Sequence, residues 1–96
     1  MGYPPPVQLV VRGPLHRWDL DGLSQRVCAV LSGLPGRVVH CHLTNVEADA
    51  VAVDALARLQ LVARREGCLV VLCDVTPELR ELLNLLGLVD VLPERL

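Results

Sequence analysis

The sequence predicts a small α/β domain built on a largely parallel or mixed β-sheet. Short segments rich in valine and leucine, of strand length, alternate along the chain with longer segments in which apolar residues recur every three or four positions. The chain has 96 residues, 52% of them hydrophobic, which suits one domain with a compact core. Strands and helices in alternation are typical of a single α/β layer.

Three segments are predicted to form strands, and a short fourth strand is expected near the end of the chain. Residues 7–12 alternate between the two faces of a strand until a Gly-Pro pair interrupts the pattern. Residues 37–43 form the second strand. Residues 68–74 form the third, and their continuous apolar run predicts burial on both faces. Residues 89–92 provide the fourth.

Three further segments carry apolar residues at helical spacing: 19–34, 49–66 and 76–86. Asp19 and Thr76 stand where N-cap residues are favoured. A glycine directly follows the second and the third of these segments, as is common after the last turn of a helix.

Residues 1–6 contain three consecutive prolines and are expected to form a flexible tail ahead of a domain that spans residues 7–96. The same start lacks the positive and apolar regions of a secretory signal. The longest apolar run, residues 69–73, is far shorter than a membrane-spanning helix, so we expect a cytoplasmic protein without membrane insertion. Eleven acidic residues stand against nine basic ones, all of them Arg, which argues against nucleic acid as a partner.

The sequence contains no recognisable residue set for catalysis or metal binding. The four cysteines lie in apolar segments without C-x-x-C spacing and are expected to be reduced core residues. His40 and His42 share one face of their strand and Cys41 takes the other. A zinc site would therefore need a third ligand from elsewhere, and Cys41 would lack an adjacent base. We expect no metal, no cofactor and no enzyme activity.

The segment 44–49 joins the end of a predicted strand to the start of a predicted helix. Binding sites in open α/β sheets tend to fall at such junctions, where free N–H groups and the positive end of the helix dipole gather. Asp49 suits this position in two ways, because it either only caps the helix or also takes part in a binding site.

The helix predicted over 49–66 has two apolar sides. One wide face should cover the sheet. The second stripe packs either against a neighbouring helix or against a partner protein, since an apolar stripe with a charged rim is typical of recognition surfaces. This stripe consists of Ala50, Val53, Ala57 and Leu61.

Trp18 is the only tryptophan of the chain. We expect it to pack into the core where the first helix begins. The alternative is an interface anchor, because large aromatic side chains often dominate the energetics of protein interfaces.

Several stretches fall in the order and spacing of one known domain family. Val10-Val11-Arg12-Gly13-Pro14-Leu15-His16 is similar to a strand that ends in Gly-x-Leu-Asp, and Asp49-Ala50 falls where an Asp-Ser pair opens the second helix. The most specific stretch, Leu86-Gly87-Leu88-Val89-Asp90-Val91-Leu92-Pro93, is similar to a Gly-Leu ending after the third helix. From Val7 to Pro93 the chain resembles the STAS domain, the fold of bacterial anti-sigma factor antagonists.

This resemblance implies a STAS-like single domain, with a mixed, mostly parallel sheet of about four strands and helices packed on one side. It also implies a protein-binding module without enzyme activity. In the antagonist branch, a partner kinase phosphorylates the Ser that opens the second helix. The unphosphorylated domain captures the anti-sigma factor and thereby frees the sigma factor. A phosphate there adds about −1.5 to −2 charge beside an existing acid.

The chain departs from the family at positions that matter for this switch. Ala50 occupies the place of the acceptor Ser, and His16 replaces the Asp of the Gly-x-Leu-Asp motif, whereas Asp49 is retained. Thr44 is the nearest hydroxyl and the remaining candidate acceptor. The strand that commonly precedes Val7 is missing or replaced by the proline tail, which leaves an exposed sheet edge.

The sequence therefore predicts an interaction module that resembles anti-sigma factor antagonists. It docks a kinase-type anti-sigma factor or another ATPase-type regulator without phosphorylation at the usual position, and it is compatible with a homodimer. Two alternatives stay open: a small STAS subunit of a lipid-transport ATPase complex, and a sensor domain that binds a nucleotide or lipid near residues 45–50. The predicted contact surface comprises Leu15, His16, Arg17, Thr44, Asn45, Glu47, Asp49, Ala50, Val53, Asp54, Ala57 and Leu61.

Overall fold

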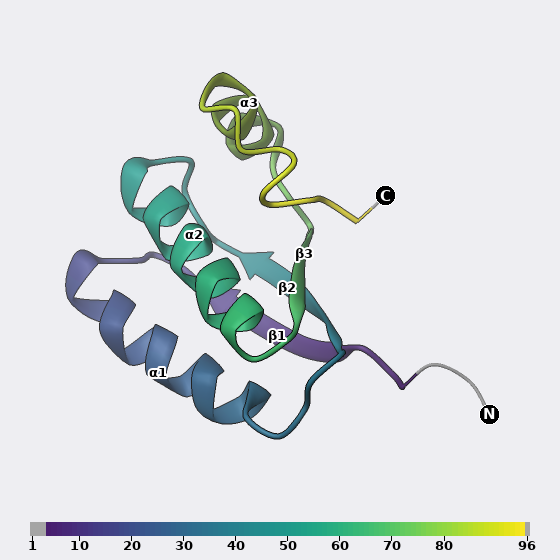
Figure 1. Cartoon of the computed structure of the whole chain (residues 1–96). Helices are drawn as coiled ribbons and strands as arrows, with labels where there is room; N and C mark the ends of the chain where they lie inside the picture. Colours follow the sequence, from purple (N-terminus) through teal and green to yellow (C-terminus); the bar gives the residue numbers. More distant parts are fainter. Residues whose placement is uncertain (1–3, 96) are drawn as a thin grey trace.

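The computed structural model describes residues 4–95, in which strands and helices alternate (Figure 1). The strands are β1 (Val7–Arg12), β2 (Val38–Thr44) and β3 (Leu69–Cys73), and the helices are α1 (Leu20–Leu31), α2 (Ala50–Arg65) and α3 (Pro77–Leu85). A short 3-10 turn, η1 (Arg17–Asp19), precedes α1. The predicted α/β class is confirmed.

The sheet has three strands in the order β1-β2-β3, and both neighbouring pairs are parallel. The expectation of a mixed sheet with about four strands is therefore wrong. Residues 89–92, predicted as the fourth strand, form a turn because the Leu88 carbonyl accepts hydrogen bonds from the N–H groups of Val91 and Leu92. Within the described residues, the chain beyond this turn meets β3 at a single bridge between Glu94 and Leu72.

The core lies between one face of the sheet and the helices α1 and α2, which Figure 1 shows side by side over that face. Every second side chain of β2 is buried here, as the predicted alternation requires, whereas β1 buries Val11 and only half-buries Val7 and Leu9. The helix α1 buries the residues that recur at helical spacing, and α3 closes one end of the core. The buried residues of these two helices are Leu20, Leu23, Val27, Leu31, Leu79 and Leu83.

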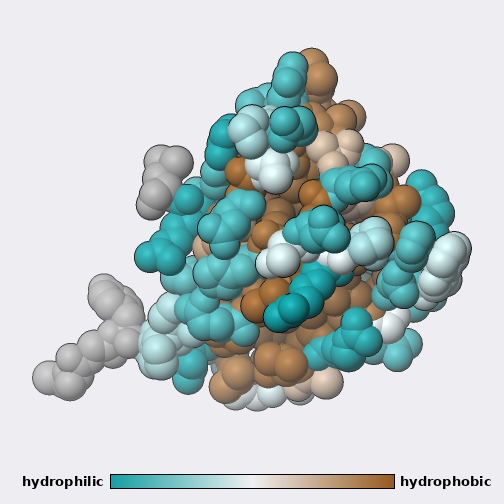
Figure 2. All heavy atoms as spheres, turned by 180° about the vertical axis from the view of Figure 1, so that it is seen from behind, coloured by the Kyte–Doolittle hydropathy of each residue, from teal (hydrophilic) through white to brown (hydrophobic). Residues whose placement is uncertain are grey.

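The opposite, outer face of the sheet is half-exposed. Figure 2 views the molecule from behind and shows apolar side chains in the middle of this view, interrupted by hydrophilic ones. Leu69 on β3 is 40% exposed, so the prediction that the third strand is buried on both faces is wrong. The reason is that α1 and α2 both cover the inner face.

The helix ends follow the predicted capping only in part. The Thr76 hydroxyl caps α3 by accepting a hydrogen bond from the Leu79 N–H at 3.2 Å. Asp19 precedes α1 but makes no cap, because its carboxylate accepts the N–H of His16 at 3.0 Å. The helix ends at Leu31 rather than near residue 34, since Ser32 is already extended.

Of the predicted tail over residues 1–6, the structure describes Pro4–Pro6, and the rest lies outside the described residues. These prolines carry no regular secondary structure. Arg37 donates a hydrogen bond to the Pro5 carbonyl at 3.0 Å, which holds the chain ahead of β1 near the start of β2.

The described residues bear on two predictions, the absence of a membrane-spanning helix and the state of the cysteines. None of the helices within residues 4–95 combines the length and the apolar character needed to cross a bilayer. The four cysteines are free thiols, as predicted, and three of them are buried.

Gln60 of α2 is the buried polar residue of the described core and is only 1% exposed. Its side-chain amide closes the outer edge of β3. The nitrogen donates to the Val70 carbonyl (3.1 Å) and to the Val91 carbonyl (2.7 Å), and the oxygen accepts the Val70 N–H (2.9 Å). One side chain thus satisfies backbone groups of β3 that point away from β2, and it ties the C-terminal segment to them.

The C-terminal segment is held by a second polar contact. Two guanidinium nitrogens of Arg80 donate to the two carboxylate oxygens of Glu94, at 2.8 and 2.6 Å. This pairing holds the pKa of the Glu94 carboxyl below its usual range. Beside it, the Leu72 N–H donates to the Pro93 carbonyl and the Leu72 carbonyl accepts the Arg95 N–H.

Replacing Gln60 by Met keeps the length of the side chain but removes its amide. We expect the free energy of unfolding to fall by about 2–4 kcal/mol, because buried N–H and C=O groups of β3 lose their partner. Urea denaturation followed by circular dichroism measures this change. The control is Gln25→Met on the exposed side of α1, which should stay within about 0.5 kcal/mol. Equal, small losses in both variants would contradict the role given to Gln60.

Candidate docking site at the start of α2

The loop after β1 and the loop after β2 are in direct backbone contact. The Gly13 N–H donates a hydrogen bond to the Thr44 carbonyl at 2.8 Å. A Cβ atom at position 13 would lie 1.9 Å from the Asn45 carbonyl oxygen, so only glycine fits here. Asn45 itself has a φ of 56°, a left-handed conformation that asparagine tolerates better than most residues. The two loops therefore form one unit at the carboxyl ends of β1 and β2.

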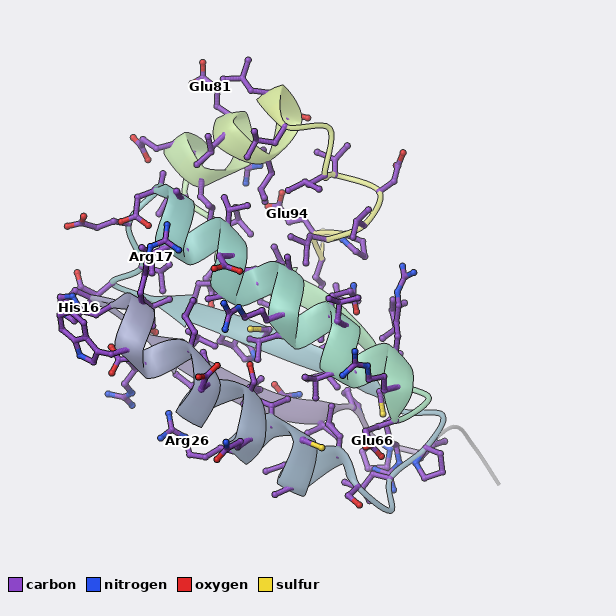
Figure 3. All side chains as sticks on the ribbon, turned by 60° about the vertical axis from the view of Figure 1, so that its left-hand side comes forward. His16, Arg17, Arg26, Glu66, Glu81 and Glu94 are labelled. Carbon is purple, nitrogen blue, oxygen red and sulfur yellow. The ribbon has the colours of Figure 1, made fainter. Side chains whose placement is uncertain are left out.

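This unit encloses a hollow of about 710 Å³, which we call the docking groove. One wall comes from the loop after β1 and from η1, and the other comes from the loop after β2 and the first turn of α2. Figure 3 shows His16 and Arg17 projecting at this end of the domain. The lining residues are Pro14, Leu15, His16, Arg17, Trp18, Glu47, Asp49, Val51 and Ala52.

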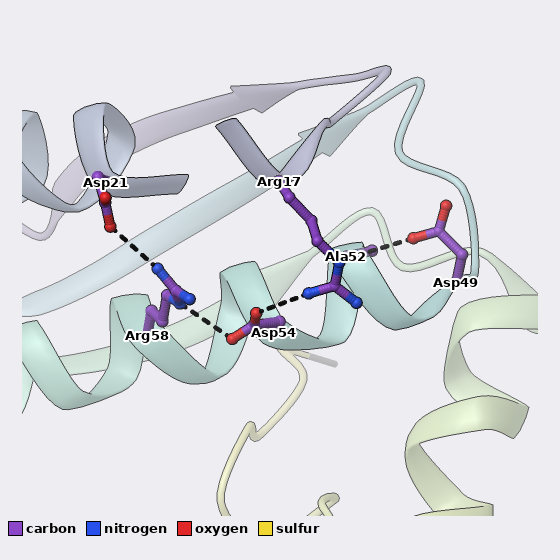
Figure 4. A network of polar contacts seen from close by, with 6 residues as sticks. All are labelled: Arg17, Asp21, Asp49, Ala52, Asp54 and Arg58. Carbon is purple, nitrogen blue, oxygen red and sulfur yellow. Dashed lines mark hydrogen bonds and ion pairs between the residues drawn. The ribbon is translucent and has the colours of Figure 1, made fainter. Parts of the chain in front are cut away.

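Asp49 caps α2. Its carboxylate accepts a hydrogen bond from the Ala52 N–H at 2.8 Å (Figure 4), which satisfies one of the free donors of the first turn. The capping interpretation is therefore confirmed. Because Asp49 is also exposed, its negative charge remains at the surface of the docking groove.

A chain of ion pairs fixes the side of α2 that faces η1 and α1 (Figure 4). Arg17 contacts Asp54 at 3.4 Å, Asp54 contacts Arg58 at 3.0 Å, and Arg58 reaches Asp21 at 3.1 Å. Each pair is partly exposed and contributes little to stability by itself. Together they hold η1, and with it the aromatic part of the groove, against α2.

Trp18 is 79% exposed and stacks on His16. The ring centroids lie 4.4 Å apart and the planes differ by 8°. The expectation that Trp18 packs in the core is wrong. Leu20 takes the buried position where α1 begins, and the 3-10 turn carries Trp18 outward. An exposed aromatic pair in a groove is the arrangement expected of an interface anchor, which was the alternative.

The structure brings together only part of the predicted contact surface. Five of its residues line the docking groove, and Thr44, Asn45 and Ala50 are exposed beside it. Leu61 is exposed too, but it lies eleven residues beyond Ala50 along α2, roughly 16 Å away. The five lining residues are Leu15, His16, Arg17, Glu47 and Asp49.

The predicted second stripe of α2 is divided. Ala50 and Leu61 are exposed, whereas Val53 and Ala57 are half-buried, and Val53 packs against the core. Asp54 faces Arg17 rather than solvent alone. Packing against a neighbouring helix therefore does not cover the two ends of the stripe within residues 4–95.

Pro14, Val51 and Ala52 line the docking groove although the sequence did not single them out. Pro14 follows the close contact of the two loops, and the other two lie in the first turn of α2, on the side that faces η1. The sequence places Val51 and Ala52 in the first turn of the predicted helix, but it does not reveal that η1 lies beside them.

The other chemically reactive side chains do not assemble into a site. Cys41 lies buried on the inner face of the sheet, where burial raises the pKa of its thiol to about 12. His42 lies on the outer face, where its ring nitrogens contact Asp74 (3.3 Å) and Gln8 (2.6 Å). Within residues 4–95, His, Cys, Asp and Glu side chains do not gather in groups of three that could hold a metal ion.

No protein-family model matches the chain, and no curated protein or solved structure matches it either. The geometry of the docking groove is therefore the guide to its chemistry. It offers an exposed aromatic pair, two exposed carboxylates and a capped helix start around one hollow. Exposed aromatic side chains and polar groups around a hollow are features that protein interfaces use.

Replacing Gly13 by Ala tests the contact between the two loops. The new Cβ meets the Asn45 backbone, so we expect a loss of about 1–3 kcal/mol or more in the free energy of unfolding. The matched control is Gly22→Ala in α1, where an added Cβ meets open space. This control should gain about 0.5–1 kcal/mol, because alanine favours a helix interior. Chemical denaturation of both variants decides the point, and an unchanged Gly13→Ala variant would show that the loops are not in close contact.

Proposed function

We propose that the chain is a cytoplasmic, non-enzymatic interaction module of the STAS type, which acts like an anti-sigma factor antagonist. In this proposal it docks a kinase-type anti-sigma factor through the docking groove. The observation that carries the proposal is the exposed Trp18–His16 stack beside the acid-capped start of α2. The ordered motifs of the sequence support the family, and the geometry of the groove supports the mode of action.

The aromatic pair supplies the apolar part of the proposed contact. A tryptophan side chain buries roughly 150–250 Å² when it is fully covered, and such residues often dominate interface energetics. With 79% of Trp18 open to solvent, most of this area is available to a partner. Stacking on His16 holds the indole in one orientation, which lowers the entropy lost on binding.

The charges at the groove indicate which surface of a partner would fit. Glu47 and Asp49 are exposed, whereas the guanidinium of Arg17 is engaged by Asp54. The groove therefore presents carboxylates to an incoming protein. A partner with basic side chains around an apolar pocket for Trp18 is complementary to it.

Ala50 bears on the regulation of the proposed contact. It is the first residue of α2 and is exposed, but it has no hydroxyl to receive a phosphate. The proposed antagonist therefore docks without modification at this position. Thr44 is exposed at the end of β2 and keeps its place as the candidate acceptor.

A sensor domain is the second candidate function, favoured by the size of the groove. Its volume of about 710 Å³ falls within the range of small-molecule sites. A nucleotide or lipid is the ligand class considered for it. Native mass spectrometry of the purified chain separates the two functions, since a sensor would retain such a ligand and a docking module would not.

Affinity purification from the native host tests the proposal, with the full chain as bait. We expect a kinase-type ATPase regulator among the recovered proteins. Trp18→Ala should weaken its binding by about 2 kcal/mol or more, and Asp49→Asn should weaken it while leaving stability unchanged, because asparagine also caps helices. The control is Leu85→Ala, an exposed position on α3, which should bind normally. Recovery of no ATPase, or normal binding by Trp18→Ala, would contradict the proposal.

The recovered kinase then tests the assignment of Ala50 to the acceptor position. We expect Ala50→Ser to become phosphorylated by it, because the new hydroxyl stands exposed at the first residue of α2. Phosphopeptide mass spectrometry locates the modification, with the unaltered chain as the control. If the variant binds the kinase but takes no phosphate, the assignment is wrong.

A further inference from the structure

The strand β1 has an open edge. Among residues 4–95 it pairs with β2 alone. The Gly13 N–H points toward β2, where it meets the Thr44 carbonyl. Because backbone groups alternate in direction along a strand, the N–H and C=O groups of Gln8, Val10 and Arg12 point away from β2. They form a row of donors and acceptors at the edge of the sheet.

A second hollow, which we call the edge groove, runs along this edge. It has a volume of about 370 Å³. Val11 contributes from the inner face of β1, and Val10 and Arg12 contribute from the outer face. A hollow that touches both faces of one strand must follow the edge of that strand. Its remaining lining residues are Pro14, Leu15, Asp19, Leu23 and Arg26.

The edge groove thus combines the unpaired edge of β1 with the side of a helix. Leu23 and Arg26 lie on α1, and Figure 3 shows Arg26 projecting away from α2. This combination suits an extended peptide, which adds a strand to the sheet edge and rests its side chains against the helix. Prolines at positions 6 and 14 bracket β1. Since proline has no N–H group, they limit the added ladder to about six residues, roughly 20 Å.

The charges of the edge groove indicate which charge a bound peptide should carry. Arg12 and Arg26 are both exposed, and neither takes part in the ion pairs found within the described residues. The one acid of the lining, Asp19, accepts the His16 N–H but keeps its charge, so the lining carries two positive charges and one negative charge. This excess of positive charge, in a chain with a net charge of −2, favours an acidic segment, because both guanidinium groups can pair with its carboxylates.

We propose that the edge groove binds an extended, acidic segment of a partner protein as a fourth strand beside β1. A second copy of this chain is the less suitable occupant, because its β1 strand carries an arginine and no acidic residue. The edge groove shares Pro14 and Leu15 with the docking groove, but neither Trp18 nor the first turn of α2 lines it. The proposal therefore does not rest on the function proposed above.

A displayed library of random peptides of about eight residues, panned against the full chain, tests the proposal. We expect enriched sequences in which β-branched residues alternate with Asp or Glu. Their binding should fall at least about tenfold in Val10→Pro, which removes an N–H that faces the open edge without breaking a bond to β2. The matched control Val10→Thr keeps this N–H and should bind normally.

Charge reversal keeps the test decisive if Val10→Pro fails to fold. The double variant Arg12→Glu with Arg26→Glu should lose the acidic peptides, and added salt should weaken their binding to the unaltered chain. Trp18→Ala should bind them normally, which separates this proposal from the docking groove. Absence of enriched peptides, or equal binding by the charge-reversed variant, would overturn the proposal. A dimer in light scattering that Val10→Pro converts to monomer would also overturn it, because a second copy would then occupy the edge.

Discussion

The contact between Gly13 and the backbone of residues 44 and 45 determines where the candidate site lies. Without a Cβ, Gly13 allows the loop after β1 to approach the Asn45 carbonyl and to donate its N–H to Thr44. This approach brings together the two walls of the docking groove, and the ion pair of Arg17 with Asp54 holds η1 against α2. The loop after β1 leads directly into η1, and the loop after β2 leads directly into the cap of α2. A looser contact would separate the aromatic pair from the carboxylates and leave two unrelated surface features.

The edges of the sheet show a complementary asymmetry. At β3, the buried amide of Gln60 and the C-terminal segment satisfy backbone groups that would otherwise face solvent. At β1, the described residues provide no such partner. Among the described residues, the edge of β3 is thus covered from within the chain, whereas the edge of β1 stays open, as the proposed strand addition requires. The docking groove and the open edge therefore have different physical origins, one in loop contact and the other in incomplete pairing.

The sequence predicted the order of elements well because local signals decide it. Alternation placed β1 and β2, helical spacing placed α1 and α2, and Thr76 and Asp49 act as caps where their residue types favour capping. The fourth strand failed because residues 89–92 have strand-like composition, whereas the Leu88 carbonyl closes them into a turn. The prediction that Trp18 packs into the core failed for a related reason. Its exposure depends on a three-residue 3-10 turn whose rotation no periodic pattern reveals. The groove depends on two loops that are distant in sequence, so although five of its lining residues could be named in advance, Pro14, Val51 and Ala52 were missed.

The function proposed for the chain requires that a partner protein covers the loops joined at Gly13. Hydrogen–deuterium exchange of the full chain, alone and saturated with the kinase-type regulator recovered from the host, tests it most directly. Slowed amide exchange should concentrate in residues 14–18 and 45–52, with α3 unchanged. Protection confined to α3 or to the outer face of the sheet, with both loops exchanging as freely as before, would contradict it.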